Sequence, residues 1–149
     1  MQRKTLGSDG PERLEKIEFF SELSLAQRKM LARMVDELVA DPGEELMREG
    51  DYGYETVFVE EGSAEVRQGG AVINNVGAGE LLGELAVLDA GGRRSASVLA
   101  ATPLRALVLT SHSMHEVRER MPDVGEAIDR AAAAHRERDR LRKAGQSAE

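Results

Sequence analysis

The stretch Gly79–Val98 reads GELLGELAVLDAGGRRSASV, and two parts of it are suited to holding an anion. In the first part, Gly83 and Glu84 follow an apolar pair. A glycine lets the backbone approach a ligand closely, and a helical turn that begins here would point free N–H groups at negative charge. An ionised carboxylate only accepts hydrogen bonds, so Glu84 suits a hydroxyl donor such as a sugar.

The second part of the stretch is Arg94-Ser95-Ala96. The planar guanidinium of arginine matches phosphate oxygens, Ser95 adds a hydroxyl donor, and Ala96 leaves room for the backbone. A carboxylate for a sugar and an arginine for a phosphate together predict a compact nucleotide site. Each feature alone has an ordinary structural explanation, such as a buried turn or a solvated loop, so the prediction depends on their combined spacing.

This pattern resembles the phosphate-binding cassette of the cyclic nucleotide-binding domain family. The family has a Gly-Glu pair, a short helix, a small loop, and then arginine, a small or hydroxyl residue and alanine. The resemblance implies that Glu84 holds the ribose 2′-hydroxyl and that Arg94 holds the cyclic phosphate. The ligand-binding residues that it implies are Leu82, Gly83, Glu84, Leu85, Ala86, Arg94, Ser95 and Ala96. Two features depart from the pattern: the loop lacks the proline often found before the arginine, and the adjacent Arg93 is a second candidate for the phosphate.

Composition indicates one globular domain that works in the cytoplasm. The chain has 149 residues, of which 41% are hydrophobic and only 3% aromatic, so aliphatic side chains must fill the core. It has no cysteine, which excludes disulfides and thiolate metal sites and fits a reducing compartment. No apolar run reaches membrane-spanning length and no signal-peptide core is present, so we expect no membrane association.

The net charge of −7 opposes binding to nucleic acid. Positive charge is concentrated near the C-terminus, where residues 128–143 contain six basic and three acidic side chains. An anionic ligand therefore needs a local positive site, which Arg94 would supply.

Residues 1–10 are polar and contain glycine, so we expect them to be disordered. Residues 11–39 are predicted to be helical. A short helix is expected over 11–17, and Ser24 would cap a second helix in which apolar residues recur at helical spacing to about Leu38.

The period changes after the turn at Asp41-Pro42-Gly43, and we expect a β-roll over residues 40–110. Strands are predicted at 56–60, 64–67, 72–76, 97–100 and 104–109, with a hairpin loop at Gln68-Gly69-Gly70. Short, regularly spaced strands indicate a barrel or jelly roll. The expected fold class is α+β: an antiparallel β-roll of the double-stranded β-helix or jelly-roll type, with N-terminal helices and C-terminal lid helices. The whole domain is expected over residues 11–143.

Helical spacing returns over residues 111–143. We expect Ser111 or Ser113 to cap the first of these helices, Pro122 to end it, and Asp123 to cap the last. In the resembling family the last helix is a lid over the base, which implies that the stripe Ala131, His135 and Arg138 faces the ligand. A solvated helix and a dimer seam are the alternatives for this segment. Residues 144–149 are expected to form a disordered tail.

Other functional classes find less support. His112, His115 and Glu116 do not have the spacing of a helical zinc motif, so no metal site is predicted. No serine elbow or Walker loop occurs, so no catalytic residue and no cofactor are predicted. A cupin-type enzyme would need histidines inside the barrel. The DNA-binding regulators of the family carry a helix-turn-helix, for which the chain ends too soon after the lid.

The expected function is therefore a non-catalytic sensor or regulatory module that binds a cyclic nucleotide and changes the conformation of its lid helix. The ligand is cAMP or cGMP. We prefer cAMP because family members that favour cGMP often have threonine after the arginine, where this chain has Ser95. The effector protein is not identified by the sequence, and a homodimer is an open alternative. The alternative function is a degenerate β-roll scaffold or interaction protein that no longer binds nucleotide.

Overall fold

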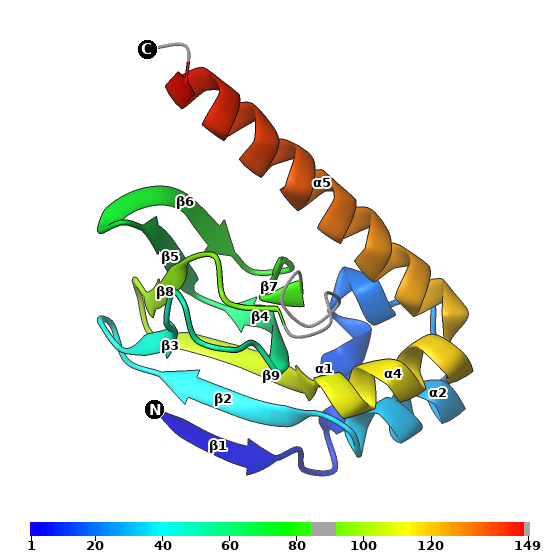
Figure 1. The fold of residues 1–149 in the computed structure, drawn as a ribbon. Helices are drawn as coiled ribbons and strands as arrows, with labels where there is room; N and C mark the ends of the chain where they lie inside the picture. The colour runs from blue at the N-terminus through cyan, green and yellow to red at the C-terminus, as the bar shows by residue number, and fades with distance from the viewer. Residues whose placement is uncertain (85–91, 148–149) are drawn as a thin grey trace.

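The computed structural model describes residues 1–84 and 92–147 and shows a β-roll with helices at one end and one long helix across the top (Figure 1). The strands are β1 (Gln2–Thr5), β2 (Asp36–Ala40), β3 (Glu45–Met47), β4 (Glu55–Glu61), β5 (Ser63–Gln68), β6 (Ala71–Gly77), β7 (Leu81–Leu82), β8 (Ser97–Ala100) and β9 (Leu104–Thr110). The helices are α1 (Gly10–Glu15), the 3₁₀ helix η1 (Glu18–Phe20), α2 (Leu25–Ala32), α4 (Ser111–Arg120) and α5 (Pro122–Ser147).

The strands form two antiparallel sheets. One sheet has the order β1-β2-β9-β4-β7, and the other has the order β3-β8-β5-β6. The strands predicted between residues 56 and 109 all form, each within one or two residues of its predicted ends. The α+β fold class with an antiparallel roll is confirmed.

Strand β4 lies between two hydrophobic cores because its neighbouring side chains point to opposite faces. Val57 and Val59 pack between the sheets, inside the roll. Phe58 points the other way, toward the helices, where its ring lies 4.9 Å from that of Phe20 and 5.6 Å from that of Phe19. All three phenylalanines of the chain are thus at this junction, and their burial fixes the helices against the roll.

The N-terminal region differs from the prediction in two ways. The expected disorder of residues 1–10 is wrong, since Gln2–Thr5 pair with β2 and Arg3 forms an ion pair with Glu55. The second helix ends at Ala32 instead of near Leu38, and Asp36–Ala40 form β2. The apolar spacing of this segment fits either a helix or a strand, and its pairing with β9 makes it a strand.

The C-terminal helices also differ at their ends. Thr110 caps α4, because its hydroxyl accepts a hydrogen bond from the N–H of Ser113 at 3.2 Å; neither predicted serine is the cap. Helix α5 begins at Pro122, so Asp123 lies in its first turn rather than at the cap. The helix continues to Ser147, where a disordered tail was expected, and residues 148–149 lie outside the described part of the chain. In that described part, no helix combines the length and the apolarity needed to cross a membrane.

Candidate functional site

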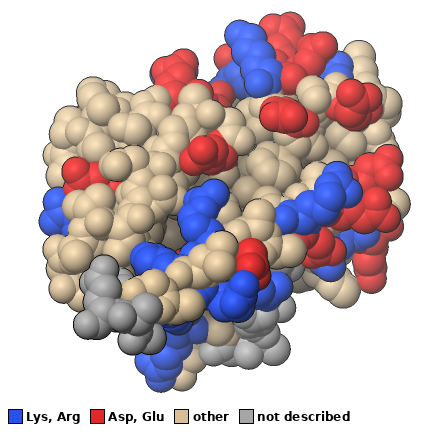
Figure 2. Space-filling model, turned by 90° about the horizontal axis from the view of Figure 1, so that it is seen from above, with Lys and Arg blue, Asp and Glu red and all other residues tan. Residues whose placement is uncertain are grey.

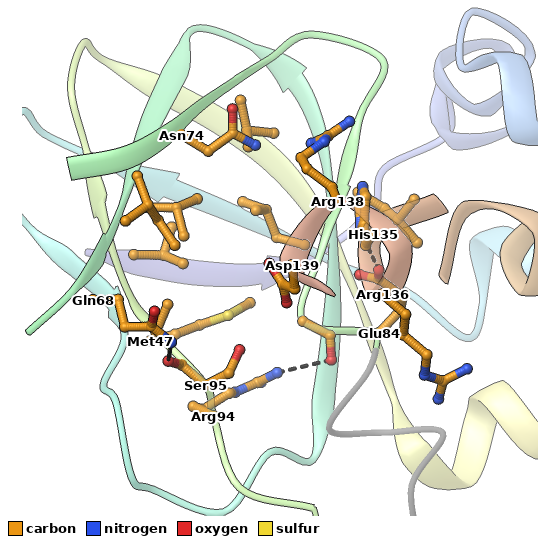
Figure 3. A pocket seen from close by; sticks show the side chains of 18 of the residues that line it. Met47, Gln68, Asn74, Glu84, Arg94, Ser95, His135, Arg136, Arg138 and Asp139 are labelled. Carbon is orange, nitrogen blue, oxygen red and sulfur yellow. Dashed lines mark hydrogen bonds and ion pairs between the residues drawn. The ribbon is translucent and has the colours of Figure 1, made fainter. Parts of the chain in front are cut away.

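A cavity of about 540 Å³ lies between the roll and α5 (Figure 3). Its size is within the usual range for small-molecule sites. Apolar side chains of the roll, such as Val66, Ile73 and Leu82, form one wall, and polar side chains of α5 form the other. The predicted ligand-binding residues Leu82, Gly83, Glu84, Arg94, Ser95 and Ala96 all line this cavity, whereas Leu85 and Ala86 lie outside the described residues.

Gly83 makes the turn that brings the cassette into the cavity. Its φ is +82°, a left-handed conformation that residues with a Cβ rarely adopt. A Cβ at this position would lie 2.3 Å from Nη1 of Arg94 and 3.0 Å from the carbonyl oxygen of Glu55. Only glycine fits this approach, and the turn places Glu84 in the interior, where it is 1% exposed.

Arg94 reaches the same turn from the loop before β8. Its Nη1 donates a hydrogen bond to the carbonyl oxygen of Gly83 at 2.9 Å, and its Nη2 donates to that of Glu55 at 2.7 Å. Burial lowers the pKa of Arg94, while the charges of Glu55 and Glu84 act in the opposite direction. An arginine keeps its charge even so, and the site therefore holds a partly desolvated cation close to a buried carboxylate.

Arg93 has a different environment. It is exposed, its guanidinium lies 4.3 Å from the ring centroid of Tyr52, and it donates hydrogen bonds of 2.9 Å to the carbonyl oxygen of Gly50 and to the hydroxyl of Tyr52. Arg93 also borders the cavity, but its hydrogen bonds are to Gly50 and Tyr52. Of the two adjacent arginines, Arg94 is the one that donates a hydrogen bond to the Gly83 turn, and this bond is dashed in Figure 3.

Helix α5 contributes His135 and Arg138 to the cavity, as the sequence predicts. Ala131, the third residue of that stripe, instead packs against the hydrophobic core and lines an adjoining cleft. Nδ1 of His135 is hydrogen bonded to Oε1 of Glu84, and this bond is the main cause that raises the pKa of His135 above its ordinary value (Figure 3).

A second connection between α5 and the roll was missed by the sequence analysis. Nη2 of Arg142 donates to the side-chain oxygen of Gln68 at 3.0 Å, and Nε2 of Gln68 donates to the carbonyl oxygen of Ser95 at 2.9 Å. The first of these bonds joins residues 74 positions apart, so no local pattern could have predicted it.

The cavity is more positive than the protein as a whole. Basic side chains border the hollow beside α5 (Figure 2). Those that line the cavity are Arg93, Arg94, Arg136, Arg138 and Arg142, and its acidic lining residues are Glu84 and Asp139. In a chain of net charge −7, this is a local site for an anion. Residues 1–84 and 92–147 contain no cluster of three or more histidine, cysteine or carboxylate side chains suited to a metal ion.

The model of the cyclic nucleotide-binding domain family matches residues 37–121. The chain belongs to this family. It is 31% identical over 120 residues to the cGMP-dependent protein kinase egl-4 of Caenorhabditis elegans, which covers 79% of this chain and 15% of that protein. It is 30% identical over 117 residues to the cAMP-dependent protein kinase regulatory subunit of Schizosaccharomyces pombe, which covers 78% of this chain and 27% of that protein.

Among solved structures, a putative cyclic nucleotide-binding protein from Geobacter metallireducens has the same fold. It superposes with a TM-score of 0.70 at 23% identity, over 87% of this chain and 95% of that chain. The curated relatives are much longer than this chain, which matches one segment of each.

Proposed function

We propose that this chain is a non-catalytic sensor domain that binds a cyclic purine nucleotide, with cAMP preferred over cGMP. The observation that carries the proposal is the convergence of Glu84 and Arg94 in one cavity around the Gly83 turn. Arg94 would pair with the cyclic phosphate and Glu84 would accept a hydrogen bond from the ribose. The preference for cAMP rests on Ser95, which stands where cGMP-selective relatives often have threonine.

Helix α5 supplies the route from ligand to response. His135 of this helix contacts Glu84, and Arg142 is linked through Gln68 to the backbone of Ser95. A ligand that binds Glu84 or the backbone of Ser95 would therefore alter the contacts that attach α5 to the roll. A ligand shifts such an equilibrium only by its difference in affinity for the two arrangements. The receiver would be an effector protein or a second copy of the chain.

Calorimetric titration with cAMP and cGMP tests the proposal, and the adjacent arginines provide a matched pair of variants. Arg94→Ala removes one partner of a partly buried ion pair with the phosphate, which typically costs about 2–5 kcal/mol and so lowers affinity by about 30-fold or more. Arg93→Ala, which removes an exposed charge, should change affinity by less than about fivefold. Arg94→Lys should restore binding only in part, because it keeps the charge but loses the planar fork.

Three outcomes would contradict the proposal or part of it. Absence of binding to either nucleotide would favour the degenerate scaffold. Tighter binding of cGMP than of cAMP would reverse the preference. If chromatography shows that the pure protein converts cAMP to a ring-opened product, the domain is an enzyme.

A further inference from the structure

The carboxylate of Glu84 has a protein partner in the position where the proposed function needs a ligand. Glu84 is 1% exposed, and one of its oxygens is hydrogen bonded to Nδ1 of His135. The side chain of His135 is 29% exposed, so its imidazole forms the boundary between this carboxylate and solvent. A sugar hydroxyl that binds Glu84 from the cavity must therefore displace the imidazole or share the carboxylate with it.

We propose that His135 is a pH-dependent competitor for Glu84, which the ribose hydroxyl displaces when it binds this carboxylate. This inference rests on the proposed function, in which Glu84 recognises the ribose. The role assigned to His135 is opposite to that of a lid residue that contacts the ligand. The contact that attaches α5 to the roll occupies the Glu84 carboxylate, which the ribose would need.

The competition depends on pH because the two competitors differ in charge. A protonated imidazole adds the attraction between opposite charges to its hydrogen bond with a carboxylate, and a neutral donor to the same carboxylate lacks this attraction. A ribose hydroxyl is always neutral. At low pH His135 therefore holds Glu84 more strongly than the hydroxyl can, and deprotonation removes this advantage.

The surrounding charged groups determine how long His135 stays protonated. The hydrogen bond to Glu84 is the largest influence and raises the pKa of His135, and Asp139 on α5 acts in the same direction. Burial and the charge of Arg138 lower it. Arg94 faces Glu84 from the cassette side of the cavity, and the acidic residues that line the adjoining cleft with His135 are Glu18, Glu22, Glu80, Asp123 and Glu126.

The sign of the pH effect follows from these directions. Ligand binding that displaces His135 returns its pKa toward the ordinary value, so binding releases a proton. Affinity should then rise as the pH rises from the ordinary histidine pKa of about 6.5 to the raised pKa in the unliganded protein, and it should be flat below and above that window.

The second attachment of α5 limits what the displacement of His135 does. Arg142 holds the helix to Gln68 independently of Glu84, and no imidazole takes part in that bond. Release of His135 would therefore free the carboxylate without detaching the C-terminal half of α5, and we expect a local rearrangement around residue 135.

The experiment is a calorimetric titration with cAMP at several values between about pH 5.5 and about pH 8.5, which bracket the ordinary histidine pKa. Wild type should bind about fivefold more tightly at the upper end, the fold-change equivalent to about 1 kcal/mol for the ion-pair attraction that is lost when the imidazole is neutral. His135→Ala should bind more tightly than wild type at low pH and should lose this slope. Alanine suits the helix at this position.

The matched control is His115→Ala. His115 also lies on a helix and also faces a carboxylate, Glu119, at 3.1 Å, but the pair is exposed on α4 and does not line the cavity. This variant should keep the wild-type slope. A slope that survives in His135→Ala, or weaker binding by His135→Ala across the whole range, overturns the proposal.

A nucleotide-free measurement separates this inference from the proposed function. The ring signals of His135, followed by NMR, should titrate at higher pH in wild type than in Glu84→Gln. An unchanged midpoint shows that the ion pair does not form and overturns the competition. If instead the midpoint shifts but neither wild type nor His135→Ala binds nucleotide at any pH, the failure lies in the proposed function, and the competition is rejected with it.

Discussion

Gly83→Ala is the substitution for which the structure gives the most direct estimate. The alanine must adopt the left-handed φ of +82°, which costs a residue other than glycine about 1–2 kcal/mol. The ideal position of its Cβ also lies only 2.3 Å from Nη1 of Arg94, so the guanidinium must move away. A displacement of the guanidinium by about 1 Å would break its 2.9 Å hydrogen bond to the carbonyl of residue 83, and bonds that involve a charged group contribute about 1.5–3 kcal/mol.

The two contributions together predict a loss of about 2.5–5 kcal/mol in the free energy of unfolding, measured by urea denaturation and circular dichroism. Gly79→Ala is the matched control. Gly79 has a similar φ of +89°, but its added Cβ would meet no atom within 4 Å. It should therefore lose only the conformational part, about 1–2 kcal/mol.

The difference between the two variants isolates the contact with Arg94. Gly83→Ala should also bind cAMP more weakly than Gly79→Ala, because the arginine that would meet the phosphate has moved. Equal losses of stability in the two variants would show that Arg94 does not depend on the open space at residue 83, and would refute the packing described for the cassette turn.

Four further predictions concern the core, a helix cap and α5. Phe58→Ala should lower the free energy of unfolding by about 3–5 kcal/mol, since its side chain is fully buried against Phe20; a loss below about 1.5 kcal/mol in urea denaturation would contradict the role given to this junction. Thr110→Ala should cost about 1 kcal/mol through the lost cap of α4, and Thr110→Ser should restore most of it. Amide exchange around residue 135 should be slower below pH about 6.5 than above the raised pKa of His135, because a raised pKa stabilises the contact while the imidazole is protonated; after correction for the intrinsic pH dependence of exchange, a rate that ignores pH would argue against it. Saturating cAMP should slow exchange over residues 124–140 outside the turn around residue 135, where the ligand displaces the imidazole from Glu84, and an unchanged rate throughout would indicate a helix that does not respond to ligand.

Strands β4, β5, β6, β8 and β9 could be predicted because each carries its own signal, an apolar run or alternation bounded by turn residues, whereas the two- and three-residue strands β7 and β3 are too short to carry one. Strand β1 has no such signal: all four of its residues are exposed, and its position depends on pairing with β2 and on the ion pair between Arg3 and Glu55. The predicted end of the second helix was wrong for a related reason. The spacing of Leu31, Val35 and Leu38 suits a helix, but only the pairing with β9 shows that Leu38 belongs to a strand.

The site shows the same division. The turn at Gly83, the carboxylate of Glu84 and the loop arginine lie within a short stretch with distinctive spacing, so the sequence could place them together. The contacts made by α5 could not be predicted, since they join residues far apart in the chain and depend on how the helix crosses the roll. His135 and Arg138 of the helical stripe line the cavity, but periodicity does not show that His135 contacts Glu84 or that Ala131 packs against the core.

The stacking of Arg93 on Tyr52 has an optical consequence. The chain has no tryptophan and only two tyrosines, and both rings lie together, with centroids 6.4 Å apart, on the outer side of the loop that carries the two arginines. Near-ultraviolet emission from the native protein therefore arises almost entirely from one small region beside the cassette. A movement of Arg93 would change the environment of the Tyr52 ring that it contacts, so the domain contains its own fluorophore for stopped-flow measurements and needs no attached dye.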